Sequence, residues 1–225
     1  MPQSAWVFPP ATTADEHGIV GIGADLTPST VLAAYSRGLF PMPLERDGPI
    51  AWWSPDPRAI MPLDMHVSRS LRRSMRKFTF TINTAFTEVI ASCANPDRAH
   101  GWIDSQIMRA YTTLHELGWA HSVETRNSDG KVVGGVYGIG FGRFFAGESM
   151  FHTETDASKA ALVYLTRTLT NSGVELFDVQ WMTKHLSTLG AIDLSRSDYL
   201  RRLETVVSNA SRLTLTAIEE TKEMS

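Results

Sequence analysis

The sequence has little cysteine, no long apolar run and almost no net charge. Cys93 is the one cysteine among 225 residues, so the chain cannot form an internal disulfide bond. No uninterrupted apolar stretch approaches the ~20 residues that a membrane-spanning helix needs. The first ten residues, MPQSAWVFPP, lack the basic head and apolar core of a secretion signal. We therefore expect a cytoplasmic protein that does not associate with a membrane.

Motifs for metals and nucleotides are also missing. The seven histidines show no H-E-x-x-H or comparable spacing, which argues against a metal-dependent hydrolase and predicts no metal site. The glycines of GGVYGIGFG lie between two strand patterns, whereas a phosphate-binding loop lies between a strand and a helix start. Close packing or a bulge explains such glycines better. We expect no nucleotide cofactor.

The apolar pattern that is present predicts a mixed α+β protein. Residues 1–64 hold most of the prolines and indicate turns around one helix, with Thr27 as its N-cap. From residue 65 onward the pattern predicts a strand at 78–83, two helices, an antiparallel hairpin, a further strand, a long helix at 156–171, and then strand, helix and strand. We predict a small domain over residues 1–64 and a larger one over residues 65–225.

Basic side chains gather in HVSRSLRRSMRKF. Four arginines at positions i, i+3, i+4 and i+7 share one helix face, and Lys77 follows them; the four are Arg69, Arg72, Arg73 and Arg76. Because like charges at this spacing weaken an isolated helix, the arrangement favours an anionic partner such as a phosphate backbone. The alternative is a solvated face balanced by acids elsewhere in the fold. The net charge of −3 excludes coating of nucleic acid through bulk charge but allows this local patch.

Three classes of function remain open at this point: an acyl-group transferase, a nucleic-acid-binding module and the disfavoured hydrolase. Asp178 and Gln180 lie two residues apart on a predicted strand and should share one face. Glu148 is a single carboxylate after two phenylalanines. Both features also fit satisfied polar groups near strand ends.

Seven motifs resemble one family over residues 17–203. They are GADLTPSTVLAAYSRGLFP, WWSPDPR, GWID, GGVYG, GESMF, DASKAAL and FDVQW, and their order and spacing are similar to those of the leucyl/phenylalanyl-tRNA–protein transferases. The resemblance implies a small N-terminal domain on a C-terminal domain of the GCN5-related acetyltransferase (GNAT) fold. It implies transfer of leucine or phenylalanine from aminoacyl-tRNA to the N-terminal arginine or lysine of a protein, which marks that protein for degradation.

The resemblance also implies roles for the polar residues. Glu148 in GESMF would meet the cationic side chain of the acceptor. Asp178 would polarise Gln180 and share the proton that leaves the attacking amine, while Gln180 would orient that amine. Asp178, water and a tRNA hydroxyl all stay open as the route for the proton.

Donor binding would use apolar and aromatic residues. Val136 and Phe145 would accept the leucine or phenylalanine side chain, and Trp102 would stack on the terminal adenosine. Two positions depart from the family pattern. Met42 stands where a tryptophan is common, which weakens the expected stacking, and Thr153 stands where arginine is common.

Two alternatives remain beside this interpretation. One is an acetyl-coenzyme A-dependent acetyltransferase of the same fold, although GESMFHTETDASK supplies an acid where a pyrophosphate would bind. The other is a non-enzymatic RNA-binding module built on the arginine face. We expect the protein to be a monomer.

Overall fold

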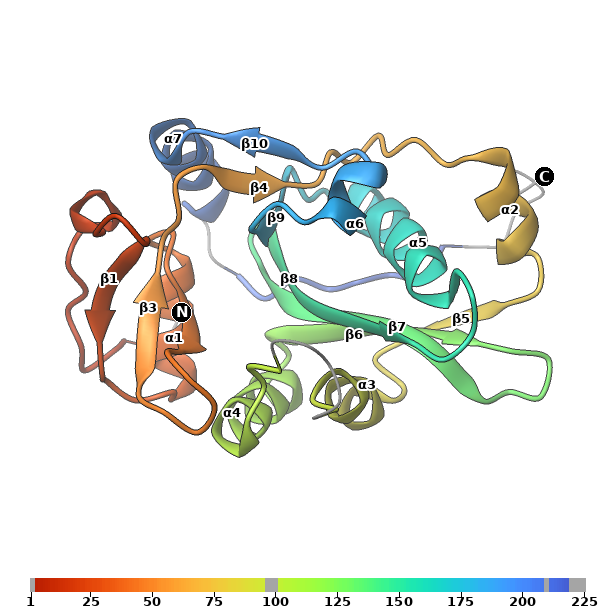
Figure 1. The fold of residues 1–225 in the computed structure, drawn as a ribbon, viewed down its shortest axis with the longest axis horizontal. Helices are drawn as coiled ribbons and strands as arrows, with labels where there is room; N and C mark the ends of the chain where they lie inside the picture. The colour runs from red at the N-terminus through yellow and green to blue at the C-terminus, as the bar shows by residue number, and fades with distance from the viewer. Residues whose placement is uncertain (1–2, 96–100, 209–210, 219–225) are drawn as a thin grey trace.

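The computed structural model describes residues 3–95, 101–208 and 211–218, which form two β-sheets with helices around them (Figure 1). The small sheet has the strand order β1-β3-β2, with β1 Ile19–Ile22, β2 Phe40–Pro43 and β3 Ile50–Trp53. The large sheet has the order β10-β4-β9-β8-β7-β6-β5. Its strands are β4 Arg58–Ile60, β5 Thr79–Ile82, β6 Ala120–Arg126, β7 Val132–Phe141, β8 Phe144–His152, β9 Leu176–Gln180 and β10 Ile192–Leu194.

Helices lie on both faces of the large sheet and beside the small one (Figure 1). A 3₁₀ turn, η1, spans Ala11–Thr13. The α-helices are α1 Pro28–Tyr35, α2 Arg69–Met75, α3 Phe86–Cys93, α4 Ser105–Glu116, α5 Ala157–Asn171, α6 Lys184–Thr188 and α7 Arg196–Val207. The α5 helix covers one face of the large sheet, and α3 and α4 cover the other (Figure 1). The predicted mixed α+β class is confirmed.

Elements with a clear hydrophobic periodicity or local cap and turn signals follow the sequence prediction. The Asp104 carboxylate accepts the N–H groups of Gln106 and Ile107 at 2.8 and 2.9 Å and so caps α4 as expected. Strands β6 and β7 form the predicted antiparallel hairpin, with Gly130 at φ 76° in its turn. The predicted helix at 156–171 is α5.

The N-terminal part differs from the expectation of turns around one helix, because its strands form a sheet. Two of the four β2 residues, Pro41 and Pro43, are prolines, and β2 pairs only with β3, at the edge where strand prolines are tolerated. Thr27 precedes α1 as predicted but makes no capping bond; instead the Asp25 carboxylate accepts from its N–H at 3.0 Å. The chain passes into the large sheet at β4, and the boundary at residue 64 stays a prediction.

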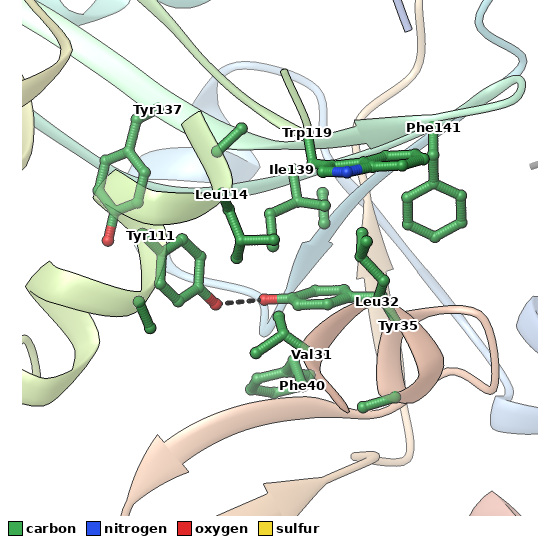
Figure 2. Close-up of a cluster of buried hydrophobic side chains, with 14 of the residues drawn as sticks. Val31, Leu32, Tyr35, Phe40, Tyr111, Leu114, Trp119, Tyr137, Ile139 and Phe141 are labelled. Carbon is green, nitrogen blue, oxygen red and sulfur yellow. Dashed lines mark hydrogen bonds between the residues drawn. The ribbon is translucent and has the colours of Figure 1, made fainter. Parts of the chain in front are cut away.

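One apolar core joins the two parts of the chain. Side chains of α1 such as Val31 and Leu32 are fully buried against Leu114 of α4 and Ile139 of β7 (Figure 2). Burial of this size supplies ~1.5–3 kcal/mol for each such side chain. A second core lies under α5, between Leu162 and Leu165 of the helix and Val136 and Phe177 of the sheet. The small sheet is therefore fixed against the large one.

The alternate glycines of β7 serve packing, as the sequence context suggested. A Cβ atom on Gly138 would lie 2.1 Å from the Ala146 carbonyl oxygen and 2.5 Å from the Phe145 ring. A Cβ atom on Gly140 would lie 3.0 Å from the same ring. A side chain at Gly138 would clash with the β8 backbone and the Phe145 ring, and one at Gly140 would clash first with Leu213, whose Cδ2 would lie 2.6 Å away. Among the described residues, no helix is long and apolar enough to cross a membrane.

Candidate functional site

A cavity of about 500 Å³ opens beside the parallel strands β8 and β9. Its wall is mostly apolar and aromatic and carries a few polar groups, as ligand-binding cavities usually do. The lining comes from β2, β7, β8, α5, β9 and α6 and from Trp102, and it includes Phe40, Met42, Trp102, Val136, Glu148, Met150, His152, Ser158, Leu162, Phe177, Val179, Gln180, Trp181, His185 and Leu186.

Glu148 occupies an irregular position in β8. Tyr137 pairs with Ser149 and Gly138 pairs with Gly147, so Glu148 is an extra residue with no partner in β7. This is a β-bulge, a feature that re-aims a side chain and is frequent beside active sites. Glu148 lines the cavity, and it is the one acidic residue among the described residues that do so.

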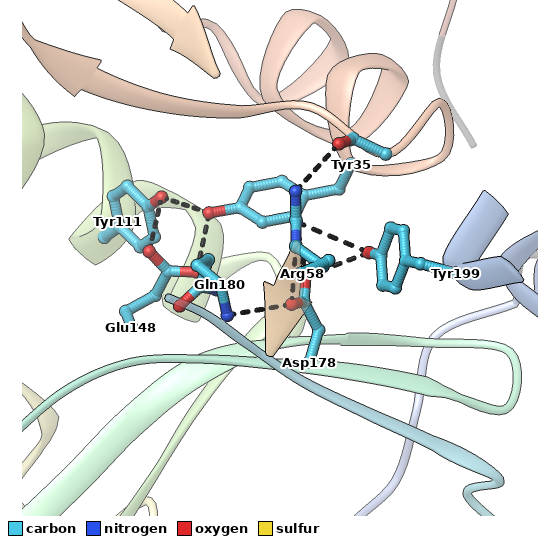
Figure 3. Close-up of polar contacts among 8 residues, drawn as sticks. Tyr35, Arg58, Tyr111, Glu148, Asp178, Gln180 and Tyr199 are labelled. Carbon is cyan, nitrogen blue, oxygen red and sulfur yellow. Dashed lines mark hydrogen bonds and ion pairs between the residues drawn. The ribbon is translucent and has the colours of Figure 1, made fainter. Parts of the chain in front are cut away.

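Two tyrosines meet the Glu148 carboxyl group (Figure 3). The Tyr35 hydroxyl of α1 donates to Oε1 at 2.6 Å, and the Tyr111 hydroxyl of α4 donates to Oε2 at 3.2 Å. The two hydroxyl oxygens lie 2.7 Å apart (Figure 2). Both tyrosines are buried. The three oxygen-bearing groups therefore form a closed triangle at the end of the cavity.

Burial favours the protonated form of Glu148. It raises the pKa of Glu148 to about 8, with a further rise from the Asp178 charge and an opposing effect of the two tyrosine donors. Near neutral pH the protonated form therefore predominates.

Asp178 is saturated by other partners (Figure 3). Its two carboxylate oxygens accept from Nε and Nη2 of Arg58 at 2.9 and 2.6 Å, and Oδ2 also accepts from the Tyr199 hydroxyl at 2.9 Å. Both ions are buried. The Arg58 guanidinium lies between the rings of Phe40 and Tyr199, 4.7 and 4.5 Å from their centroids. Asp178 thus holds β4, β9 and α7 together.

The contact of Asp178 with Gln180 is with the main chain, not with the side-chain amide that we expected Asp178 to polarise. Oδ1 accepts the Gln180 backbone N–H at 2.9 Å. Gln180 has φ 59°, which is uncommon for a residue other than glycine, and this bond fixes that conformation. Its side chain is 7% exposed, and Nε2 has no hydrogen-bond partner among the described residues. Gln180 therefore presents a buried, unsatisfied donor at the cavity.

The predicted donor-binding residues divide into two groups. Trp102, Met42 and Val136 line the cavity. Phe145, expected in the pocket, does not line it: its ring is buried in the core and packs edge-on against Phe177 at 5.6 Å. Phe145 pairs with Phe177 and so lies on the same face of the sheet, but its ring packs over Gly138 and Gly140, and Phe177 is the one of the two that lines the cavity.

Trp181 is an aromatic residue of the cavity that the sequence did not single out. Its ring lies edge-on to Phe40 at 4.8 Å and to Trp53 at 5.7 Å. The backbone carbonyl of Met42 accepts from the Trp53 indole N–H at 2.9 Å. Because Met42 replaces a tryptophan, one side of the expected adenosine site was predicted to lack an indole. Trp181, which directly follows β9, provides an indole on that side.

The basic stretch forms the amphipathic helix that its spacing predicts. Leu71, Met75 and Phe78 are buried, while the four arginines and Lys77 are exposed. Among the described residues, no acidic group forms an ion pair with any of the five. The balancing acids of the alternative interpretation are therefore not seen in the described parts of the chain.

Sequence reasoning missed Tyr35, Tyr111, Arg58 and Tyr199. Tyr35 and Arg58 stand inside quoted motifs, AAYSRGLFP and WWSPDPR, and their place in these motifs is the signal that could have found them. Tyr111 has the helical spacing of a core residue. Among the described residues, no group of three histidine, cysteine, aspartate or glutamate side chains could hold a metal ion.

Known proteins match almost the whole chain. The family model described as leucyl/phenylalanyl-tRNA protein transferase matches residues 59–204, and the model of that family's N-terminal domain matches residues 24–56. A leucyl/phenylalanyl-tRNA–protein transferase of Aromatoleum aromaticum is 49% identical over 85% of this chain and 83% of its own length. One of Legionella pneumophila (strain Corby) is 46% identical over 89% of this chain and 91% of its own length.

A solved structure also resembles the chain. L-PGS from Bacillus licheniformis is 14% identical, with a TM-score of 0.40, over 55% of this chain and 45% of that one.

Proposed function

The chain belongs to the leucyl/phenylalanyl-tRNA–protein transferase family, and from this we propose that it moves leucine or phenylalanine from aminoacyl-tRNA to the N-terminal arginine or lysine of acceptor proteins. The new N-terminal residue would then mark the acceptor for degradation. The observation that carries the proposal is Glu148, one acid in a largely apolar cavity, held by two buried tyrosines.

Glu148 supports a cationic acceptor. A neutral Glu148 costs little where burial raises its pKa, and an arriving guanidinium or ammonium favours its ionised form. A charge-assisted contact of this kind contributes ~1.5–3 kcal/mol, enough to separate basic from neutral first residues. Tyr35 and Tyr111 donate to the ionised carboxylate and fix its orientation.

The reaction needs orientation more than activation. The acceptor's α-amine attacks the carbonyl carbon of the aminoacyl ester, an amide C–N bond forms, the ester C–O bond breaks, and the ribose oxygen regains a proton. Gln180 Nε2, buried without a partner, is suited to donate a hydrogen bond to the carbonyl oxygen as negative charge develops there. Asp178 supports this step by holding the Gln180 backbone, because its own oxygens are committed to Arg58 and Tyr199.

The donor would occupy the rest of the cavity. Val136, Met150, Leu162 and Phe177 offer an apolar wall for a leucine or phenylalanine side chain. Trp102 and Trp181 offer flat faces for the terminal adenine.

The body of the tRNA would meet α2. Arg69, Arg72 and Arg73 on α2, and Arg76 and Lys77 directly after it, are exposed and can neutralise phosphates. Because charged tRNA is the donor, we place the reaction in the cytoplasm. We also assign the large sheet to the GNAT fold, since one parallel strand pair, β8 and β9, borders the cavity in an otherwise antiparallel sheet.

A transfer assay tests the proposal. Purified protein is mixed with tRNA charged with labelled phenylalanine and with either of two peptides that differ only in a first residue of arginine or alanine, without coenzyme A. We expect label on the arginine-first peptide, at least tenfold faster than on the alanine-first one. If a separate reaction with labelled acetyl-coenzyme A labels the peptide and the charged tRNA does not, the protein is the acetyltransferase instead. Binding of tRNA without transfer would indicate an RNA-binding module.

A further inference from the structure

We propose that His152, Lys159 and His185 form a phosphate-binding rim of the cavity, which holds a phosphodiester next to the terminal nucleoside of the donor. The inference rests on the proposed function and adds a binding site to it. The three residues come from β8, α5 and α6, and both histidines line the cavity.

His152 is oriented by a buried serine. The Ser158 hydroxyl, 3% exposed, lies 3.1 Å from Nδ1 of His152. When this hydroxyl donates to Nδ1, the ring proton is on Nε2, which is then a donor for a ligand in the cavity. Since Ser158 also lines the cavity, the pair belongs to its wall and does not face away from it.

Basic side chains converge at this rim. Both histidines line the cavity, and burial, followed by the charges of Lys159 and His152, lowers the pKa of His185. Asp156 is also at the rim and bonds to Lys159 at 3.1 Å. An anion in the cavity would accept hydrogen bonds from the two imidazoles and be attracted by the charge of Lys159.

The rim connects the cavity to the basic helix. Asp156 Oδ2 accepts from the Ser74 hydroxyl of α2 at 2.8 Å, while Asp156 Oδ1 accepts from Lys159 of α5. A nucleic-acid strand that leaves the cavity past Ser158 therefore reaches α2 by way of His152 and Lys159. The α5 helix begins at Ala157, so the positive end of its dipole adds to the same rim.

A phosphodiester fits this arrangement better than a carboxylate. The donors come from three elements around one opening, and a phosphate accepts hydrogen bonds from several directions at once. A phosphodiester also joins two nucleosides, so it can lie between a nucleoside in the cavity and the rest of the nucleic-acid chain outside it. The rim would thus bind the phosphate of a second nucleotide without contacting its base.

The test compares two stable ligands that differ only in the charge of one linkage. Both carry cytidine joined to adenosine with phenylalanine attached through an amide; the linkage is a phosphodiester in one and an uncharged methylphosphonate in the other. Dissociation constants are measured by calorimetry. We expect the phosphodiester to bind the wild-type protein about tenfold more tightly, a single charge-assisted contact.

The double variant His152→Asn/His185→Asn should bring the two affinities within about twofold of each other. Because both histidines line the cavity, its affinity for phenylalanylamido-adenosine, which has no phosphate, serves as the baseline and should fall much less than its affinity for the phosphodiester ligand. Arg202→Ala serves as the matched control, because it removes an exposed charge from α7, outside the described lining of the cavity.

If the wild-type protein binds the two ligands with equal affinity, the proposed phosphate-binding rim is wrong, while the proposed function is unaffected. A double variant that still prefers the phosphodiester tenfold would lead to the same conclusion. Failure of the wild-type protein to bind any of the three compounds would instead contradict the proposed function, and the rim with it.

Discussion

Under the proposed function, the protonation state of Glu148 and the choice of acceptor are linked. Burial favours the protonated acid, whereas the two tyrosine donors and a cationic acceptor favour the carboxylate. Acceptor binding therefore releases a proton at pH values below the raised pKa of about 8. The preference for arginine over a neutral first residue should become stronger as the pH rises toward that value.

Glu148→Gln tests this link. The amide keeps the shape but cannot ionise, so the ratio of kcat/KM for arginine-first and alanine-first peptides should fall at least tenfold at pH 8. In the wild-type enzyme the ratio should rise between pH 6 and 8, and in the variant it should stay flat. The peptides share the same attacking α-amine, so its own titration cancels in the ratio.

Thermal melts give the control for fold. The folded-state pKa of Glu148 is raised from 4.5 to about 8, so the folded state binds the proton more tightly than the unfolded state. The stability from this group is fully present below pH 4.5 and is lost as the pH rises through 8. Glu148→Gln should therefore melt at the wild-type temperature or above at pH 9. Equal slowing of both peptides would move Glu148 from acceptor selection to the reaction centre or the scaffold.

At the scale of elements, the pair of Arg58 and Asp178 connects β4 to β9 in the middle of the protein. Asp178→Asn would leave Arg58 buried and without its counterion, which costs ~3–5 kcal/mol. We expect the free energy of unfolding, measured in urea, to fall by that amount. The double variant Arg58→Met/Asp178→Asn should recover at least half of the loss, since it removes the unpaired charge.

The outcome separates two roles for Asp178. If Asp178→Asn is as stable as the wild type but has a lower kcat for both peptides, Asp178 is the group that takes the proton. A loss of stability that the double variant repairs would show that Asp178 acts through the fold and the Gln180 backbone.

Local pattern predicted those elements whose information is local. The α4 cap, the β6–β7 hairpin and the amphipathic α2 each depend on neighbouring residues. The small sheet was missed because its strands are four residues long and one of them contains two prolines.

The polar centre of the site could not be derived from local pattern. Tyr35 and Glu148 are 113 positions apart, and Arg58 and Asp178 are 120 apart. Only tertiary pairing distinguishes a buried tyrosine that donates to a carboxylate from one that fills the core. Phe145 and Phe177 are likewise paired on one face of the sheet, so only the tertiary arrangement decides that Phe177 reaches the cavity.

At the scale of the whole molecule, the net charge of −3 conceals one basic face. Tandem replacement by alanine of Arg69, Arg72, Arg73 and Arg76 should weaken tRNA binding and flatten its salt dependence. Each lost phosphate contact lowers the slope of log K against log salt by ~0.7–0.9. The measurement is a binding titration at several salt concentrations, with circular dichroism to check the fold.

A matched change elsewhere provides the comparison. Arg201→Ala/Arg202→Ala removes two exposed charges from α7, and its slope should stay close to that of the wild type. If the two variants reduce the slope equally for each charge removed, binding depends on net charge and α2 is not the tRNA site. Sedimentation of the same samples would check the expected monomer.

The extra residue of β8 also determines which changes the protein can accept. In a regular antiparallel strand, a side chain and its cross-strand neighbour are selected together, so altered chemistry disturbs the sheet. Glu148 has no such neighbour, while Gly147 and Ser149 on either side remain paired with β7. Position 148 can therefore exchange an acid for an amide or a neutral side chain without loss of register. If Glu148 selects the acceptor as proposed, a change at this position can alter acceptor preference without altering the strand pairing around it.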